Sequence, residues 1–286
     1  MRHDRKRGPP HGRPLRRDGV AADQSKSQVQ SGPAPAAERE RAVAPGLRLF
    51  GIHAVAAALA NAKRPIQKLR LTDNAENRLA DVLKARDAKH ERVQPRDLDR
   101  LLGADTVHQG ALLETALLEE PSLGELALAA RQGGPLVVLD QVTDPHNVGA
   151  ILRSAAVFGA TGLVMTRRNS PELGGVLAKS ASGALEHVPV VLVTNLARAL
   201  EELAEAGVMR VGLDGEAEGL IEDGDLTGGL ALVLGSEGRG LRRLTREGCD
   251  RLCRIGTAAA FGSLNVSNAA AIALHVAAAA RRARAR

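Results

Sequence analysis

Short apolar runs alternate with helix-like segments along the second half of the 286-residue chain, and this alternation constrains its fold more than any other feature. The run from Leu136 to Asp140 is apolar except for its last residue, as is typical of a strand buried on both faces of a sheet. The same reasoning predicts strands at 163–165, 188–193, 208–213, 230–234 and 252–255, and helices at 148–158, 173–179, 196–206, after Arg242 and at 266–282. The alternation predicts an α/β domain whose mostly parallel sheet carries helices on both faces.

A smaller α/β unit is expected before this domain. Its pattern predicts helices at 52–60, 76–88 and 97–102, and strands at 66–71, at Val93 and at 111–117. A polar stretch begins at Glu119, and the break Gly133-Gly134-Pro135 ends it. The sequence therefore predicts a basic tail at 1–45, a small domain at 46–118, a linker at 119–134 and a larger domain at 135–286.

Positive charge is concentrated in the tail. Residues 1–44 contain ten Lys or Arg and five Asp or Glu, which leaves +1 of the formal charge of +6 for the remainder of the chain. Few apolar residues accompany these charges, so the tail is expected to be disordered. Basic tails of this kind often bind polyanions such as RNA, and a solubilising extension is the equal alternative. Prolines and acidic residues in the tail disfavour a transit peptide.

Composition disfavours a membrane protein and a metalloprotein. The apolar runs are far shorter than the roughly 18 to 20 residues that cross a bilayer, so no membrane partner is expected. Cys249 and Cys253 are the only cysteines, and no histidine or second pair stands at zinc-ligand spacing. We expect two reduced, partly buried thiols, no metal, and a cytoplasmic location.

Three polar clusters follow expected strands of the larger domain. They comprise residues 144–149 with Arg153, residues 235–240, and residues 263–268. Because the carboxyl ends of parallel strands share one edge of a sheet, open α/β sheets bind their ligands there. The clusters therefore predict a ligand site at that edge.

The first cluster is expected to begin a helix with Asn147 as its cap. On that helix Arg153 lies four residues after Gly149, so it projects over a position where an approaching ligand meets no side chain. A capped helix with an ordinary surface arginine is the alternative interpretation.

The second and third clusters differ in what they offer a ligand. The order G-x-x-G-x-G in the second allows close backbone approach but is neither a dinucleotide fingerprint nor a P-loop, and Glu237 is either an ordinary exposed charge or a ligand-facing group. The third has more polar side chains, Ser263, Asn265, Ser267 and Asn268, than one helix N-terminus needs. The alanines that follow indicate a packing surface, within the chain or between subunits.

Taken in order, the clusters resemble the three motifs of the SpoU (TrmH) family of RNA 2′-O-ribose methyltransferases. The resemblance covers about residues 47–283. The motifs stand here as Asp144-Pro145-x-Asn147-x-Gly149-Ala150-Ile151-x-Arg153-Ser154-Ala155, Leu234-Gly235-Ser236-Glu237-Gly238-x-Gly240 and Ser263-Leu264-Asn265-Val266-Ser267.

The resemblance implies a SPOUT fold with a deep trefoil knot, an exception to unknotted topology. It implies S-adenosylmethionine bound in the knot against Gly235, Ile255 and Leu264, and a homodimer with the active site at the subunit interface. The small domain, with Leu49–Val55 and His108-Gln109-Gly110, resembles the ribosomal-protein-like (L30e-like) RNA-binding domain of the family's rRNA enzymes. Gly256 departs from the family, where a proline is common, and the basic tail is not a family feature.

The resemblance also implies catalytic roles. Methyl transfer from a sulfonium to a ribose hydroxyl is an in-line displacement that needs no metal, and a cation beside the developing alkoxide contributes about 3 to 4 kcal/mol in comparable sites. Arg153 is the expected cation; because a guanidinium stays protonated, the proton acceptor remains open. Asn147 and Asn265 are expected to position Arg153 and the ribose, Glu237 to hold the arginine or the substrate, and Ser263 to support the pocket.

The substrate choice leaves alternatives. The stretches 183–190 and 194–198 resemble family members that methylate a guanosine of 23S rRNA, whereas other members modify tRNA with an almost identical catalytic domain. A non-catalytic RNA-binding or ribosome-assembly protein is a further alternative, although Arg153, Glu237 and Asn265 argue against it. A nicotinamide-dependent dehydrogenase is the weakest, because its glycine pattern is absent.

Overall fold

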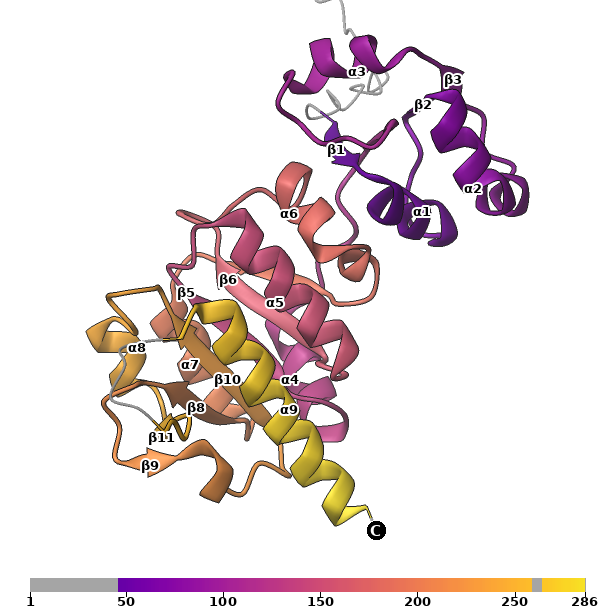
Figure 1. Ribbon diagram of the computed structural model, residues 1–286. Helices are drawn as coiled ribbons and strands as arrows, with labels where there is room; N and C mark the ends of the chain where they lie inside the picture. Colours follow the sequence, from indigo (N-terminus) through magenta and orange to yellow (C-terminus); the bar gives the residue numbers. More distant parts are fainter. Residues whose placement is uncertain (1–45, 259–263, 286) are drawn as a thin grey trace, which may run out of the picture. The chain divides into compact units, whose positions relative to one another are not determined.

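A seven-stranded parallel sheet forms the core of the larger domain (Figure 1). The computed structural model describes residues 46–258 and 264–285. The strands lie in the order β7-β6-β5-β10-β8-β11-β9, and all neighbours in the sheet run parallel. They are β5 (Leu136–Asp140), β6 (Gly162–Thr166), β7 (Val190–Val193), β8 (Met209–Leu213), β9 (Gly219–Leu220), β10 (Leu230–Gly235) and β11 (Arg251–Arg254). The predicted mostly parallel sheet is confirmed.

Helices cover both faces of this sheet. One core cluster joins α4 (Leu123–Gln132) and α7 (Leu196–Glu205) to Leu136 and Val138 of β5. The other joins α5 (Pro145–Val157), α6 (Gly175–Ala181) and α9 (Val266–Arg284) to Val137 and Leu139 of the same strand. Successive residues of β5 thus point into opposite cores, which explains why the strand is apolar without alternation.

A four-stranded mixed sheet forms the smaller unit, with the order β1-β4-β2-β3. The strands β1 (Leu47–Phe50), β4 (Ala111–Thr115) and β2 (Lys68–Leu71) pair antiparallel, whereas β3 (Glu91–Arg92) lies parallel to β2. Helices α1 (Ile52–Ala60), α2 (Asp73–Arg86) and α3 (Pro95–Leu102) accompany it. The short strands β1 and β9 and the 3₁₀ turns η1 (Ala184–Glu186) and η2 (Ile221–Asp223) are additions to the predicted elements.

A buried ion pair joins the segment after α1 to η1. Arg64 and Glu186 approach to 2.8 Å, with side chains only 3% and 2% exposed. Asn61 Nδ2 donates to the same carboxylate at 2.8 Å, and Arg64 Nη1 donates to the Ala116 carbonyl at 2.9 Å. We call Asn61, Arg64 and Glu186 the brace. Removing one partner from such a pair leaves an uncompensated buried charge.

Helix α4 lies where the sequence predicted a polar connection. Its start is a capping box, in which the Ser122 hydroxyl accepts from the Glu125 amide at 3.2 Å and the Glu125 carboxylate accepts from the Ser122 amide at 2.7 Å. Its apolar stripe packs into the core that also contains α7. The S-x-x-E signal was present in the sequence, but the polar residues before it obscured the helix.

The start of α5 corrects the predicted cap. Asp144, not Asn147, is the N-cap, and its Oδ1 accepts from the His146 amide at 2.9 Å. The helix begins at Pro145, because a proline at the first helical position has no amide to leave unpaired. Asn147 therefore lies inside the first turn, where its side chain is available for other contacts.

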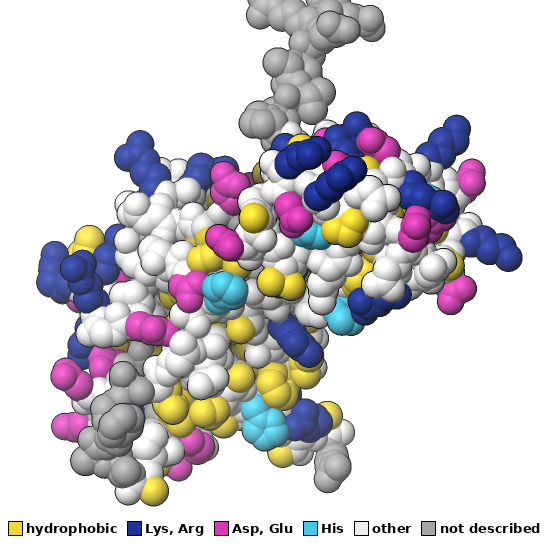
Figure 2. Space-filling view, turned by 45° about the horizontal axis from the view of Figure 1, so that its top comes forward, with side chains coloured by type: hydrophobic (Ala, Val, Ile, Leu, Met, Phe, Trp, Pro, Cys, Tyr) yellow, Lys and Arg dark blue, Asp and Glu magenta, His cyan; other side chains and the backbone are white. Residues whose placement is uncertain are grey.

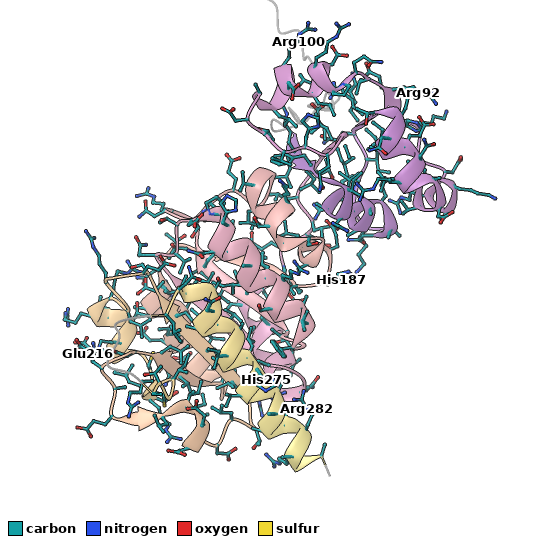
Figure 3. All side chains as sticks on the ribbon, viewed as in Figure 1. Arg92, Arg100, His187, Glu216, His275 and Arg282 are labelled. Carbon is teal, nitrogen blue, oxygen red and sulfur yellow. The ribbon has the colours of Figure 1, made fainter. Side chains whose placement is uncertain are left out.

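The alanines of α9 pack largely within the chain. Ala270, Ala273 and Ala277 are fully buried in the core shared with α5. The ring of Phe158, just after α5, lies edge to face with that of His275, and the ring centroids are 5.6 Å apart. Figure 3 labels His275 on α9. Figure 2 shows hydrophobic side chains gathered on the face that carries α5 and α9. None of the described helices is long and apolar enough to cross a membrane.

Candidate active site

The site lies between β5 and β10, where the order of the strands in the sheet reverses direction. From β5 the chain adds β6 and β7 on one side, whereas β10 and β8 lie on the other. Asp140 ends β5 and is in register with Gly235, which ends β10. We call the carboxyl ends of β5, β10, β8 and β11 the carboxyl edge. A switch point of this kind is where open α/β sheets bind their ligands.

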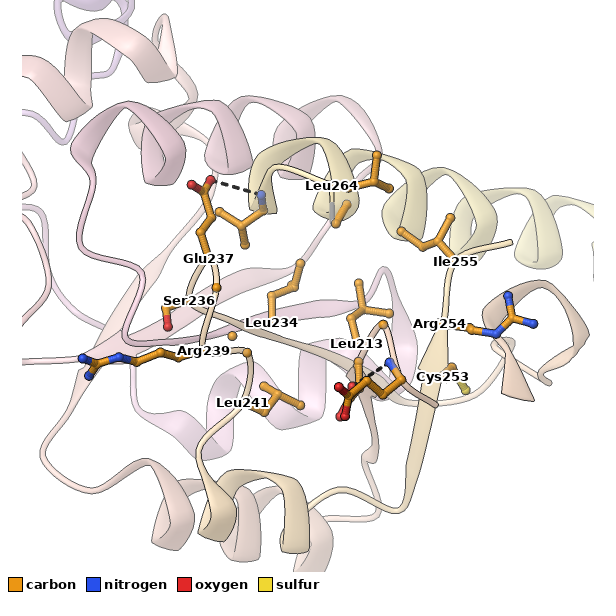
Figure 4. A pocket seen from close by; sticks show the side chains of 18 of the residues that line it. Leu213, Leu234, Ser236, Glu237, Arg239, Leu241, Cys253, Arg254, Ile255 and Leu264 are labelled. Atoms are coloured by element: carbon orange, nitrogen blue, oxygen red, sulfur yellow. Dashed lines mark hydrogen bonds between the residues drawn. The ribbon is translucent and has the colours of Figure 1, made fainter. Parts of the chain in front are cut away.

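A cavity of about 790 Å³ opens at the carboxyl edge (Figure 4). Its walls come from three loops and a helix start: residues 213–216 after β8, 234–241 at the end of β10, 253–258 at the end of β11, and Leu264, Val266 and Ala269. This volume is within the usual range for small-molecule sites. Residues 213–216 were not anticipated, because nothing in their sequence separates them from an ordinary turn.

The three residues expected to bind the methyl donor all line this cavity. They are Gly235, Ile255 and Leu264. Residues 235–241, here called the glycine loop, fold back so that Ser236 and Gly240 pair and the Gly240 amide donates to the Ser236 carbonyl at 2.9 Å. A Cβ on Gly235 would collide with the carbonyl group of Gly240, so the return of the loop requires a glycine.

Three predicted catalytic residues meet beside the cavity. Glu237 Oε1 accepts from Asn147 Nδ2 at 3.0 Å and from Asn265 Nδ2 at 2.6 Å, and Asn265 Nδ2 also donates to Asn147 Oδ1 at 3.0 Å. Asn265 caps α9, since its Oδ1 accepts from the Ser267 amide at 2.9 Å. We call Asn147, Glu237 and Asn265 the polar cluster. It joins the three sequence motifs through side chains.

Arg153 stands outside the polar cluster. Its side chain is exposed on α5 and makes no hydrogen bond or ion pair with another residue of the described part. Within residues 46–258 and 264–285, Arg153 does not make the expected contact with Glu237. Glu237 instead accepts hydrogen bonds from the two asparagines. Ser263 lies outside the described residues.

Gly149 serves helix packing rather than ligand access, which corrects the sequence interpretation. It is buried, and a Cβ there would lie 2.5 Å from Ser180 Cβ and 2.7 Å from the Leu177 carbonyl oxygen, both on α6. His146 adds a contact between the same helices, since its Nδ1 lies 3.2 Å from Ser180 Oγ. The glycine is needed because α5 and α6 approach too closely for any side chain.

Two further ion pairs border the cavity and were missed in the sequence. Asp140 is fully buried and pairs with Arg242, which directly follows the glycine loop. Asp214, after β8, pairs with Arg246 at 2.7 Å. The only sequence signal for Asp140 was a charge at the end of an apolar run; its partner lies 102 positions away, beyond any local pattern.

The thiols of the site region are unreactive. Burial raises the pKa of Cys249 to about 11, and burial also raises the pKa of Cys253. Both side chains therefore stay protonated at neutral pH, and neither is a nucleophile. Within residues 46–258 and 264–285, no group of three His, Cys, Asp or Glu side chains is arranged to hold a metal ion.

Two family models match the chain. The SpoU rRNA methylase family matches residues 134–275, and the RNA 2′-O ribose methyltransferase substrate-binding family matches residues 48–121. The first range contains all seven strands of the larger sheet, and the second contains the four strands of the smaller sheet except Leu47.

Similar whole proteins cover nearly the same region. The 23S rRNA (guanosine-2′-O-)-methyltransferase RlmB of Ralstonia nicotianae is 44% identical over 231 residues, 79% of this chain and 92% of that protein. RlmB of Pseudomonas putida is 39% identical over 234 residues, 79% of this chain and 94% of that protein. The SpoU methyltransferase AviRb from Streptomyces viridochromogenes, solved in complex with AdoMet, has the same fold with a TM-score of 0.71 at 23% identity, covering 87% of this chain and 95% of AviRb.

Proposed function

Because the chain belongs to the SpoU family of RNA 2′-O-ribose methyltransferases, we propose that it transfers a methyl group from S-adenosylmethionine to the ribose 2′-hydroxyl of a guanosine in 23S rRNA. The observation that carries the proposal is the meeting of all three motifs in the polar cluster, beside the cavity at the carboxyl edge. The relatives that match most of the chain act on 23S rRNA guanosine, which favours that substrate over tRNA.

The cavity fits the methyl donor. Leu213, Ile255 and Leu264 form an apolar wall that would hold the adenine. Gly235 has no side chain, so the backbone of the glycine loop would be within reach of the donor. When bound, S-adenosylmethionine supplies an electrophilic methyl group on a positively charged sulfonium. We assign Gly235, Ile255 and Leu264 to donor binding.

The polar cluster has a positioning role in this proposal. Glu237 accepts hydrogen bonds from both asparagines, so it fixes the glycine loop to the starts of α5 and α9. Asn147 and Asn265 are then held beside the cavity, where they would orient the ribose. The carboxylate strengthens these hydrogen bonds because it carries a charge. Ser263 would support the same pocket.

Arg153 is the electrostatic activator in this proposal. A guanidinium beside the developing 2′-alkoxide stabilises the transition state, worth about 3 to 4 kcal/mol in comparable sites. Its exposure on α5, outside the polar cluster, leads us to propose that it completes the active site of a second subunit. The partner would cover the face of α5 and α9, where Val157 is 72% exposed.

The composite site has a direct test. Arg153→Ala should lower the rate of methyl transfer about 10²- to 10³-fold by removing the cation. Gly235→Val should abolish methyl transfer by blocking the glycine loop. Mixing the two impaired proteins under conditions of subunit exchange should restore part of the activity, because one site of each mixed dimer is intact. No gain in activity from a mixture shown to contain mixed dimers would place Arg153 in its own subunit's site.

We propose the knot and the L30e-like domain on the family resemblance, and the domain bounds and the location on the sequence pattern and composition. The proposed features are a trefoil knot in the larger domain, an L30e-like RNA-binding domain at 46–118, a linker at 119–134, a methyltransferase domain at 135–286 and a cytoplasmic location. Residues 259–263, which precede α9, fall outside the described part. The basic tail at 1–45 is proposed as an additional RNA contact.

The substrate proposal is tested in cells lacking the protein. Mapping of 2′-O-methyl positions in rRNA and tRNA should show the loss of one methylated guanosine from 23S rRNA and unchanged tRNA. Loss of a methyl group from tRNA alone would assign the activity to tRNA. An unchanged map together with calorimetry showing no S-adenosylmethionine binding would indicate a non-catalytic protein.

A further inference from the structure

We propose that Arg242 binds a phosphate of the RNA substrate beside the donor cavity, and that the buried carboxylate of Asp140 orients it. The proposal rests on the proposed RNA methyltransferase function and adds a substrate contact to it. Neither residue takes part in the polar cluster or lines the cavity.

Two hydrogen bonds fix Arg242 on Asp140. Arg242 Nε donates to Oδ1 at 2.6 Å, and the Arg242 backbone amide donates to Oδ2 at 2.9 Å. Asp140 is fully buried at the end of β5, so the accepting carboxylate is held in place by its surroundings and shielded from water. Both carboxylate oxygens are thus occupied by one residue, and the guanidinium is held by its inner nitrogen.

The outer half of the guanidinium is left for a ligand. The Arg242 side chain is 52% exposed, and neither Nη1 nor Nη2 makes a hydrogen bond with another residue of the described part. These nitrogens form the planar fork that binds phosphate in a bidentate way. An arginine fixed at Nε and open at both Nη atoms is pre-organised for that contact.

The neighbouring arginines are engaged differently. Arg243 Nη1 binds both carboxylate oxygens of Glu247, at 2.7 and 2.9 Å, and Arg246 Nη1 lies 2.7 Å from Asp214. Each of these two arginines therefore has one outer nitrogen, Nη1, already bound to an acidic side chain. Arg242 also directly follows the glycine loop, and its partner Asp140 is in register with Gly235, so a phosphate there would lie next to the reacting groups.

A buried charge needs a reason beyond stability. Desolvating a carboxylate is costly, and ion pairs of buried acids are often no better for stability than apolar residues of the same volume. Asp140 nevertheless places a full charge under an exposed guanidinium. Orientation of that guanidinium toward an anion explains both the burial of the acid and the exposure of the base.

The test compares Arg242→Gln with Arg243→Gln, which removes the same charge one residue away. For Arg242→Gln we expect the KM for a full-length 23S rRNA transcript to rise about 10- to 100-fold, because one charge-assisted contact is lost. In a plot of the logarithm of the RNA-binding constant against the logarithm of the salt concentration, the slope should become shallower by about 0.7 to 0.9. That change corresponds to the loss of one phosphate contact. Calorimetry should show the Kd for S-adenosylmethionine within about twofold of wild type. Arg243→Gln should leave all three quantities near wild type.

Two further variants separate orientation from charge. Arg242→Lys keeps the charge but loses the fork, so the salt slope should return while the KM recovers only in part. Asp140→Asn should raise the KM for RNA with little change in kcat, because Arg242 keeps its charge and loses its orientation. Thermal unfolding of each variant shows whether the fold persists.

The proposal is overturned if Arg242→Gln matches Arg243→Gln, or if it weakens donor binding while the salt slope of RNA binding is unchanged. The second result would make the pair a clamp for the glycine loop. Failure of the proposed function is distinguishable, because the wild-type protein would then transfer no methyl group to RNA, whereas the binding slopes are measured without turnover.

Discussion

Asp140 and Glu186 are both buried carboxylates paired with arginines, but the two arginines differ. Arg64, the partner of Glu186 in the brace, is itself buried and has its remaining donors on a backbone carbonyl. Arg242, the partner of Asp140 at the carboxyl edge, is half exposed, and neither of its outer nitrogens makes a hydrogen bond within the described part. The acids are alike, so the function of each pair follows from the surroundings of its base.

The exposure of the base decides what a buried ion pair can do. A pair sealed on both sides can only hold structure, because no ligand reaches either charge. A pair with a buried acid and an exposed base presents an oriented cation to whatever binds there. We therefore expect the brace to govern stability and the carboxyl edge to govern activity.

Breaking the brace should have the largest effect on stability. In Glu186→Ala the Arg64 guanidinium stays buried without its partner, and the free energy of unfolding should fall by about 3 to 5 kcal/mol. Urea denaturation measures this. The double variant Arg64→Met with Glu186→Leu, which removes both charges, should recover most of the loss. A loss below about 1 kcal/mol in Glu186→Ala would show that the brace is not structural.

Removing Arg153 should have the largest effect on activity. Because its side chain is exposed and unpaired in the described part, Arg153→Ala should leave unfolding unchanged. Loss of the cation beside the developing alkoxide should lower kcat by about 10²- to 10³-fold. Steady-state kinetics measure kcat, and calorimetry of S-adenosylmethionine binding serves as the control. Turnover near wild type would remove Arg153 from the mechanism.

The reactivity of the Cys249 thiol shows whether water reaches the interior beneath the carboxyl edge. Its pKa is raised from 9.0 to about 11. Burial is the main cause, and the negative charge of Asp140 adds to the shift. At pH 8 its thiolate population, and with it the rate of alkylation by iodoacetamide, should be about 100-fold below that of an unperturbed thiol. The raised pKa stabilises the fold below pH 9, and that contribution is lost as the pH rises through about 11. Alkylation at the unperturbed rate at pH 8 would show that the region is open to solvent.

The smallest effect is expected at the cap of α5. Asp144→Ala removes the acceptor for the His146 amide, so the free energy of unfolding should fall by about 1 kcal/mol. Asp144→Ser should retain most of the stability, because serine also caps helices. Thermal unfolding compares the two. Equal stability of Asp144→Ala and wild type would mean that the fold, and not the cap, sets the start of the helix.

The sequence predicted the large sheet well because its signals are local. Residues 136–140 and 230–234 are apolar runs of strand length, and their ends placed the first two motifs at one edge. The third motif follows the strand predicted at 252–255. The same reasoning predicted that Glu237 and Asn265 belong to one site. Helix α4 was missed, although its capping box could be read from Ser122 and Glu125.

Contacts between distant residues could not be predicted. Nothing local shows that Glu237 binds Asn147 across 90 positions, or that Asp140 binds Arg242 across 102. Gly149 shows the same limit, because only the approach of α6 distinguishes a packing glycine from one that admits a ligand. The sequence named the three residues of the polar cluster but not the ion pairs of Asp140 and Asp214. It also mistook how Asn147 and Gly149 are used locally.

The most direct test of the central claim is methyl transfer by the purified protein. It would be incubated with isotopically labelled S-adenosylmethionine and unmodified 23S rRNA or tRNA transcripts, and the RNA digested to nucleosides for mass spectrometry. The account predicts labelled 2′-O-methylguanosine from 23S rRNA and none from tRNA. Label on a base, label from tRNA alone, or no label in either RNA would contradict it.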